Sequence, residues 1–108
     1  MTQEQFNAML EETGYPVAYD HFPREEEPSL PYITFNITRA QNFYADNMVY
    51  YSRPIADVTL LTVIKSPEKE KVLTDVLDNN GITWNKIDEA FEDDESASVY
   101  AGFFEVYL

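Results

Sequence analysis

The chain has 108 residues, of which 20 are acidic and 7 basic, for a formal net charge of −13. That length suits one domain, and 44% hydrophobic residues with 15% aromatic residues are enough to form a folded core. The acidic balance excludes a surface that binds nucleic acid by neutralising phosphates, and the lack of cysteine excludes disulfides, thiolate catalysis and cysteine-based zinc sites.

The N-terminal residues predict a helix from about Gln3 to Thr13. Thr2 and Gln5 have the spacing of a capping box, and Gly14 is placed to end the helix. An apolar stripe at i, i+3 and i+4 spacing would form its buried face: Phe6, Met9 and Leu10. The start MTQEQFNAML does not resemble a signal peptide, and no run is long enough for a membrane span, so we expect a cytoplasmic protein.

Residues 16–31 hold four of the six prolines and the run REEEP. This composition disfavours both helix and central strand, so we expect a long connection along the surface, with room for a short extended piece at Val17–Tyr19. The next stretch, YITFNITR, alternates as a strand with one covered face does. One face would carry Ile33, Phe35 and Ile37, and the other Tyr32, Thr34, Asn36 and Thr38.

Two more strands are expected from MVYY and from IADVTLLTVIK, which starts at Ile55 and is apolar on both faces at its centre, as a mid-sheet strand is. Ser66, Pro67 and Glu68 then predict a helix start, and Asn80 with Gly81 its end. Its expected buried face is Val72, Leu73, Val76 and Leu77. The C-terminal stretches ITWNKIDEAFE and SVYAGFFEVYL predict an antiparallel hairpin with a charged tip.

This order of elements, α-β-β-β-α-β-β, predicts one α+β domain over residues 1–108. We expect a two-layer sandwich in which two helices cover one face of a mixed, mostly antiparallel sheet of about four to five strands. The residues expected between the layers are Phe35, Leu61, Val72, Val76 and Trp84. The opposite face would stay half exposed and suit association with another protein, with Tyr32, Thr34, Asn36, Thr59 and Tyr100 on it.

Residues suited to catalysis or metal binding are few. His21, the single histidine, adjoins Asp20, but neighbours in an extended chain point in opposite directions, so we interpret His21 as a turn or packing residue. The acidic run Glu92–Ser96 lacks the pattern of a calcium loop, and there is no glycine-rich phosphate loop. We therefore expect no catalytic residue, no cofactor and no metal, and no enzyme.

The stretch NFYADNMVYYSRP, Asn42 to Pro54, places four aromatic residues in a connection between strands. Tyrosine and arginine are enriched in protein interfaces, which makes this stretch the candidate interaction site. Its candidate interface residues are Phe43, Tyr44, Asp46, Tyr51 and Arg53. The alternative is that these aromatics pack on the sheet of their own subunit.

The chain resembles the tail terminator, or tail completion, proteins of long-tailed phages and prophages of Gram-positive bacteria. The resemblance covers nearly the whole sequence, and its most specific parts are P-Y-I at Pro31–Ile33 and N-F-x-A-D-N-x-x-Y at Asn42–Tyr50. It implies a structural virion protein that forms a ring, usually a hexamer, at the head-proximal end of the tail tube. Such a ring stops tail polymerisation and joins the head.

The partners that this resemblance implies are other copies of the chain, the tail tube protein and the head connector protein. DNA would pass through the ring without specific binding, and the protein would be found in the host cytoplasm during assembly and then in the virion tail. Two alternatives remain open. The first is a small acidic module that mimics DNA with carboxylates such as Glu25–Glu27, and the second is a minor enzyme that uses Asp20 and His21.

Overall fold

The fold is known from a computed structural model that describes residues 1–45, 48–93 and 98–108; for residues 38–39, 41–45 and 49–52 it describes the backbone alone. The elements in chain order are α1 Gln3–Leu10, the short 3₁₀ helix η1 Glu11–Thr13, β1 Val17–Tyr19, β2 Tyr32–Ala45, β3 Met48–Thr62, α2 Pro67–Asn79, β4 Thr83–Asp93 and β5 Ser98–Tyr107.

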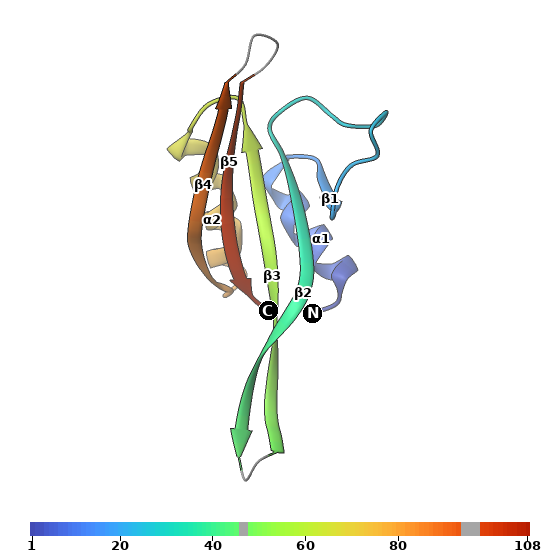
Figure 1. Cartoon of the computed structure of the whole chain (residues 1–108), viewed down its shortest axis with the longest axis vertical. Coiled ribbons are helices and arrows are strands. Elements are labelled where there is room, and N and C mark those ends of the chain that lie inside the picture. Colours follow the sequence, from blue (N-terminus) through green and yellow to red (C-terminus); the bar gives the residue numbers. More distant parts are fainter. Residues whose placement is uncertain (46–47, 94–97) are drawn as a thin grey trace.

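The five strands form one sheet in the order β1-β2-β3-β5-β4. β1 pairs with β2 in parallel, and the other neighbours are antiparallel. Both α-helices lie on one face of the sheet, behind it in the view of Figure 1. The predicted two-layer α+β sandwich is therefore confirmed, with β3 in the middle of the sheet as expected.

The signals at the ends of α1 are confirmed. The backbone N–H of Gln5 donates to Thr2 Oγ1 at 3.1 Å, and the Thr2 N–H donates to Gln5 Oε1 at 2.8 Å, which completes the capping box. Gly14 ends the following turn with a φ of +83°, a left-handed conformation that glycine adopts without a steric penalty. The predicted apolar stripe is buried: Phe6, Met9 and Leu10.

Helix α2 also begins as predicted, with Ser66 Oγ accepting from the backbone N–H of Lys69 at 3.3 Å and Pro67 at the first helical position. Its predicted buried face is wrong in one residue, Val72, which is 37% exposed. Leu73 and Leu77 are fully buried and fix the direction of the helix. Val72 lies about 120° around the helix from the centre of that pair, so it turns toward solvent.

The prediction of two separate strands after residue 47 is wrong. MVYY and IADVTLL belong to one strand, β3, which runs from Met48 to Thr62 through Pro54. Proline has no N–H to donate to a neighbouring strand. Pro54 is tolerated because it adjoins Ile55, and the pair of Ile55 with Tyr107 is the last one between β3 and β5. The expected strand count is met because Val17–Tyr19 forms β1.

Two residues face the opposite side of the sheet from the one predicted. From Ala56 on, every second residue of β3 is buried, namely Ala56, Val58, Leu60 and Thr62, so the alternation of a strand turns Leu61 away from the helices. Tyr100, expected on the half-exposed face, is 3% exposed and lies on the helix face among Glu70, Lys86 and Glu89. Phe35 is buried as predicted, whereas Trp84 and Val76 are partly buried against the core.

The two longest strands continue past the rest of the sheet. β1 pairs with β2 only at residues 33–35, and β5 pairs with β3 no further than Ile55. Residues 40–45 and 48–54, which we call the arm, thus form a two-stranded ribbon that projects from one end of the domain (Figure 1). The arm contributes to an overall length of 56 Å against widths of 28 and 25 Å.

Candidate functional site

The arm contains most of the stretch Asn42–Pro54 that the sequence marks as the candidate interaction site. Its backbone register pairs Phe43 with Tyr51 and Tyr44 with Val49. Asp46 lies outside the described residues. For Phe43, Tyr44 and Tyr51 the structure describes the backbone and not the side chain. The structure therefore brings four of the five candidate residues to one ribbon, and it places that ribbon beyond the last pair of β3 with β5.

Arg53 is the candidate interface residue with a described side chain, and its contacts are to its own subunit. Its guanidinium carbon lies 5.4 Å from the centre of the Tyr107 ring, and Nη2 donates to the Tyr107 carbonyl oxygen at 3.3 Å. A cation over an aromatic ring is stabilising. Arg53 therefore fastens the base of the arm to the end of β5.

Met48 is the described side chain nearest the arm tip, and it is 71% exposed. An isolated two-stranded hairpin is at best marginally stable in water, because one ribbon buries little apolar surface. The arm carries many large apolar and aromatic residues for such a position. In Figure 1 the two helices lie behind the wider part of the sheet and not behind the arm. The sequence alternative, in which these aromatics pack on the sheet of their own subunit, concerns side chains outside the described residues and stays a prediction.

Asp20 and His21 come together, contrary to the expectation that they point apart. Asp20 has a φ of +68°, a left-handed backbone that reverses the chain direction, and its Oδ2 lies 2.6 Å from His21 Nδ1. The hydrogen bond to His21, followed by one to Asn36, lowers the pKa of the Asp20 carboxyl. The described residues include no group of three or more side chains that could hold a metal ion.

The connection between β1 and β2 folds back over the sheet beside this pair. The Phe22 ring meets the Tyr32 ring edge to face at 5.2 Å, and Tyr32 donates its hydroxyl proton to Glu27 at 2.6 Å. Burial, together with the bond to Glu27, raises the pKa of Tyr32 to about 12. These residues border a hollow of about 320 Å³ on the face away from the helices.

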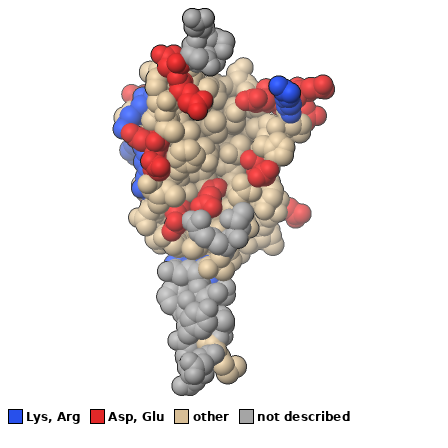
Figure 2. Space-filling view, viewed as in Figure 1, with Lys and Arg blue, Asp and Glu red and all other residues tan. Residues whose placement is uncertain are grey.

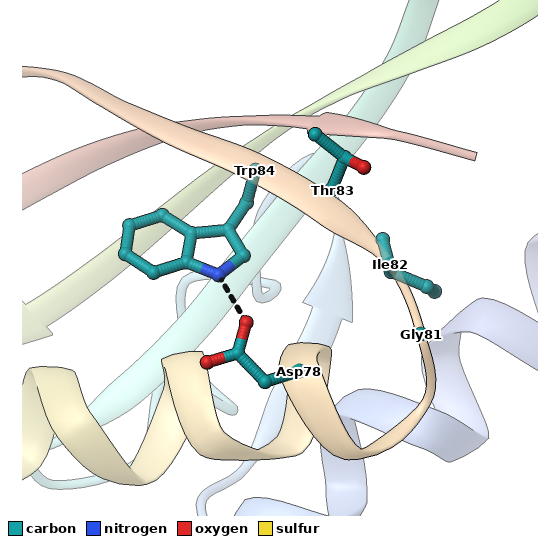
Figure 3. Close-up of a pocket in the computed structure, with 5 residues that line it drawn as sticks. All are labelled: Asp78, Gly81, Ile82, Thr83 and Trp84. Carbon is teal, nitrogen blue, oxygen red and sulfur yellow. Dashed lines mark hydrogen bonds between the residues drawn. The ribbon is translucent and has the colours of Figure 1, made fainter.

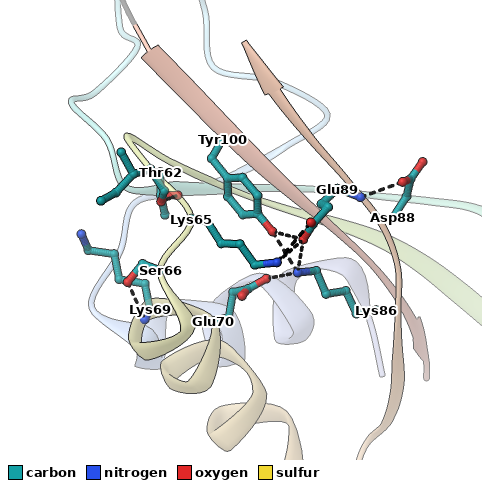
Figure 4. Close-up of polar contacts among 10 residues, drawn as sticks. Thr62, Lys65, Ser66, Lys69, Glu70, Lys86, Asp88, Glu89 and Tyr100 are labelled. Carbon is teal, nitrogen blue, oxygen red and sulfur yellow. Dashed lines mark hydrogen bonds and ion pairs between the residues drawn. The ribbon is translucent and has the colours of Figure 1, made fainter. Parts of the chain in front are cut away.

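A cluster of charged and phenolic groups ties α2 to the C-terminal hairpin on the helix face (Figure 4). Lys86 Nζ lies 2.5 Å from Glu70 Oε1, 2.8 Å from Glu89 Oε2 and 2.9 Å from the Tyr100 hydroxyl. Burial would lower the pKa of Lys86, but the bonds to Glu70 and Glu89 outweigh it and raise that pKa. Lys65 adds an ion pair to Glu89 at 3.1 Å.

Sequence reasoning missed this cluster. Glu70 occupies the inner side of α2, and a register shift between Lys86 and Asp88 turns Glu89 toward the same side as Lys86. The three-residue spacing of Lys86 and Glu89 is a weak sequence signal for an ion pair. In a regular strand these two side chains would lie on opposite faces, and the register shift that brings them to one face depends on the pairing of β4 with β5. The two carboxylates, of Glu70 and Glu89, balance the two ammonium groups, of Lys65 and Lys86, so we interpret the cluster as a structural connection.

A second hollow, of about 360 Å³, lies at the turn between α2 and β4 (Figure 3). Trp84 Nε1 donates to Asp78 Oδ1 at 2.8 Å across it. Its lining comes from one continuous stretch of chain plus Asp78, and it includes Gly81 in a left-handed conformation with a φ of +70°. This bond fastens the turn, and the hollow offers a ligand no converging charged groups besides Asp78.

The surface charge of the described residues is unevenly distributed. The sheet face opposite the helices is mostly uncharged with scattered carboxylates, and Lys and Arg appear at its margins (Figure 2).

No helix in the described ranges is long and apolar enough to cross a membrane. The chain matches neither a protein-family model nor a curated protein. The grounds for a function are therefore these surfaces and the resemblance carried by the sequence.

Proposed function

We propose that the chain is a structural protein of a phage or prophage tail. It associates with copies of itself as a ring at the head-proximal end of the tail tube, stops tail polymerisation and presents a surface for joining the head. The sequence resemblance supplies the biological setting of this proposal. The arm supplies its physical support.

The projecting arm is the observation that carries the proposal. Its two strands pair with each other from Ala40↔Pro54 to Ala45↔Met48. In this region β1 does not pair with β2 and β5 does not pair with β3, so the outer edge of each strand has no neighbouring strand. An arm of this kind gains stability when a second molecule covers its aromatic side chains and its unpaired edges. A neighbouring subunit in a ring is such a molecule.

Contacts at the base of the arm fix its orientation relative to the domain. Arg53 stacks on Tyr107, and the backbone N–H of Leu108 donates to the Pro54 carbonyl oxygen at 3.0 Å. These two contacts join the arm to the last residues of the chain. A ribbon that is fixed at its base loses less conformational entropy on association than a free loop does.

The experiment is complementation of a phage that lacks its terminator gene, read by electron microscopy of the tails. The test variant replaces residues 43–51 with Asn-Gly, which closes the paired residues Asn42 and Ser52 with a two-residue turn. We expect tails of uncontrolled length that fail to join heads. The control is Phe91→Ser, which removes an aromatic that is 53% exposed on β4, away from the arm. Normal, head-joined tails from a folded arm-shortened variant would contradict the proposal.

A further inference from the structure

The sheet face opposite the helices carries a groove that runs across the strands. Four side chains form its central row through successive register pairs: Thr34, Thr59, Phe103 and Asp88 on β2, β3, β5 and β4. Two hollows, of about 320 and 290 Å³, both border Thr59, so they are neighbours on this row, and the two together are the groove. The groove lies within the domain, and no residue of the arm lines it.

Apolar side chains lie on both sides of Thr59 in the floor of the groove. Leu61 and Phe103 point to this side of the sheet, and the hollow around Phe103 is also lined by Ile87. Ile87 stands at the register shift between Lys86 and Asp88 and is 53% exposed. A bulge re-aims a side chain, and here it leaves a large aliphatic residue exposed beside an aromatic one.

Carboxylates border both ends of the groove. Asp20 and Glu27 line the end at β2, next to the Phe22 ring, and Asp88 lines the end at β4. Asp57, on the central strand β3, lines one side of the hollow around Phe103. Neighbouring strands are about 4.8 Å apart, so the three intervals from β2 to β4 span about 14 Å, which is four to five residues of extended chain. The groove thus has apolar side chains between an acidic end at β2 and an acidic end at β4, with one further carboxylate, Asp57, beside them.

We propose that this groove binds a segment of a partner protein in which two basic residues flank an apolar centre, four to five residues apart. Arginine or lysine would meet the carboxylates at each end, and an aliphatic side chain would pack on Phe103 and Ile87. A second copy of the chain is a poorer match for this groove than a basic segment, because the chain has 20 acidic and 7 basic residues. Nucleic acid is excluded by the same charge.

The test uses a labelled peptide, Gly-Arg-Ala-Leu-Leu-Ala-Arg-Gly, with the full chain and fluorescence anisotropy. Two matched pairs of variants separate the groove from the overall charge. Ile87→Ser is paired with Ile64→Ser, since Ile64 is 62% exposed outside the groove. Asp88→Asn is paired with Glu68→Gln, which removes one charge from α2 instead.

We expect Ile87→Ser and Asp88→Asn each to weaken binding about fivefold or more, and their partners to change it less than about twofold. Peptides with Glu in place of Arg, or Ser in place of Leu, should bind weakly. The proposal is overturned if Glu68→Gln weakens binding as much as Asp88→Asn, because the affinity for the peptide then depends on the net charge of the chain and not on the groove. It is also overturned if Ile87→Ser dissociates an assembly of the chain without peptide, because the occupant is then a second copy.

Discussion

The ammonium group of Lys86 joins three elements of the fold at one point. It contacts Glu70 of α2, Glu89 of its own strand and the Tyr100 hydroxyl of β5. The Lys86 side chain is 29% exposed and that of Glu70 14% exposed, so water screens this pair less than a surface pair. Replacing one partner would leave a carboxylate that has lost much of its solvent and its counter-charge.

We expect Lys86→Met to lower the free energy of unfolding by about 1–3 kcal/mol, since it leaves Glu70 without its cation. The matched control is Lys71→Met, which removes the exposed pair between Lys71 and Asp75 and should cost less than about 0.5 kcal/mol. Urea unfolding of both variants measures the difference. Equal losses would mean that the cluster around Lys86 adds no more than a surface ion pair.

Acid should weaken the same cluster through Glu89. Hydrogen bonds from Lys86, and then from Tyr100 and Lys65, lower the pKa of Glu89 from 4.5 to about 2. A carboxyl with a lower pKa in the folded state adds stability that is present above its unfolded pKa and lost as the pH falls through its folded pKa. Unfolding free energy should therefore fall between about pH 4.5 and pH 2, and Glu89→Gln should flatten that fall.

The control for the acid profile is Glu92→Gln, which changes an exposed carboxylate on the same strand. Its profile should keep the slope of the unmodified chain. Thermal unfolding at several pH values gives both curves. A slope that is the same in Glu89→Gln and in the unmodified chain would show that Glu89 has no special part in acid stability.

At the scale of elements, α2 is oriented by two leucines. Leu73 and Leu77 are fully buried against the sheet, and Glu70 lies on the same side of the helix as they do. The neighbouring valine, Val72, is 37% exposed. One turn of helix thus contains an apolar residue that holds the two layers together and another that is largely outside them.

We expect Leu73→Ala to lower the free energy of unfolding by about 2–5 kcal/mol, because the substitution leaves a cavity between helix and sheet. Val72→Ala should cost less than about 1 kcal/mol, since half-exposed side chains lose little burial. Chemical denaturation of the two variants compares them directly. A larger loss for Val72→Ala would mean that α2 is rotated from the orientation described.

Features that depend on nearby residues could be predicted from the sequence. The Thr2 and Gln5 capping box, the Ser66 cap and the Gly14 stop involve groups within a few positions of one another. The number of helices and the covered face of β2 followed from their periodicity. The aromatic stretch from Asn42 to Pro54 is also visible in the sequence, and its role as an interaction site stays a prediction.

Features that depend on pairing between distant strands could not be predicted. Leu60 and Leu61 are both leucine, so alternation alone does not say which one faces the helices. The stretches MVYY and IADVTLLTVIK predict two separate strands, but they form one strand, because Pro54 between them is accommodated where the pairing of β5 with β3 ends. The arm arises because β2 and β3 are longer than their neighbours, and Asp20 meets His21 because its backbone is left-handed. None of these has a local sequence signal.

At the scale of the whole molecule, two surfaces are available for partners. The arm projects along the long axis of the domain (Figure 1), and the groove lies within the domain on the open sheet face. They share no lining residue, so a variant of one leaves the other intact. Self-association and binding of a basic segment can therefore be measured separately in the same chain.

The mass of the chain in solution tests the central claim, which is that the arm joins subunits to one another. Light scattering with size exclusion should give a multiple of 12.5 kDa for the unmodified chain. The variant with Asn-Gly in place of residues 43–51 should give the mass of one subunit, with an unchanged circular dichroism spectrum apart from the lost strand residues. A single-subunit mass for the unmodified chain, or the same assembly in a folded arm-shortened variant, would contradict the claim.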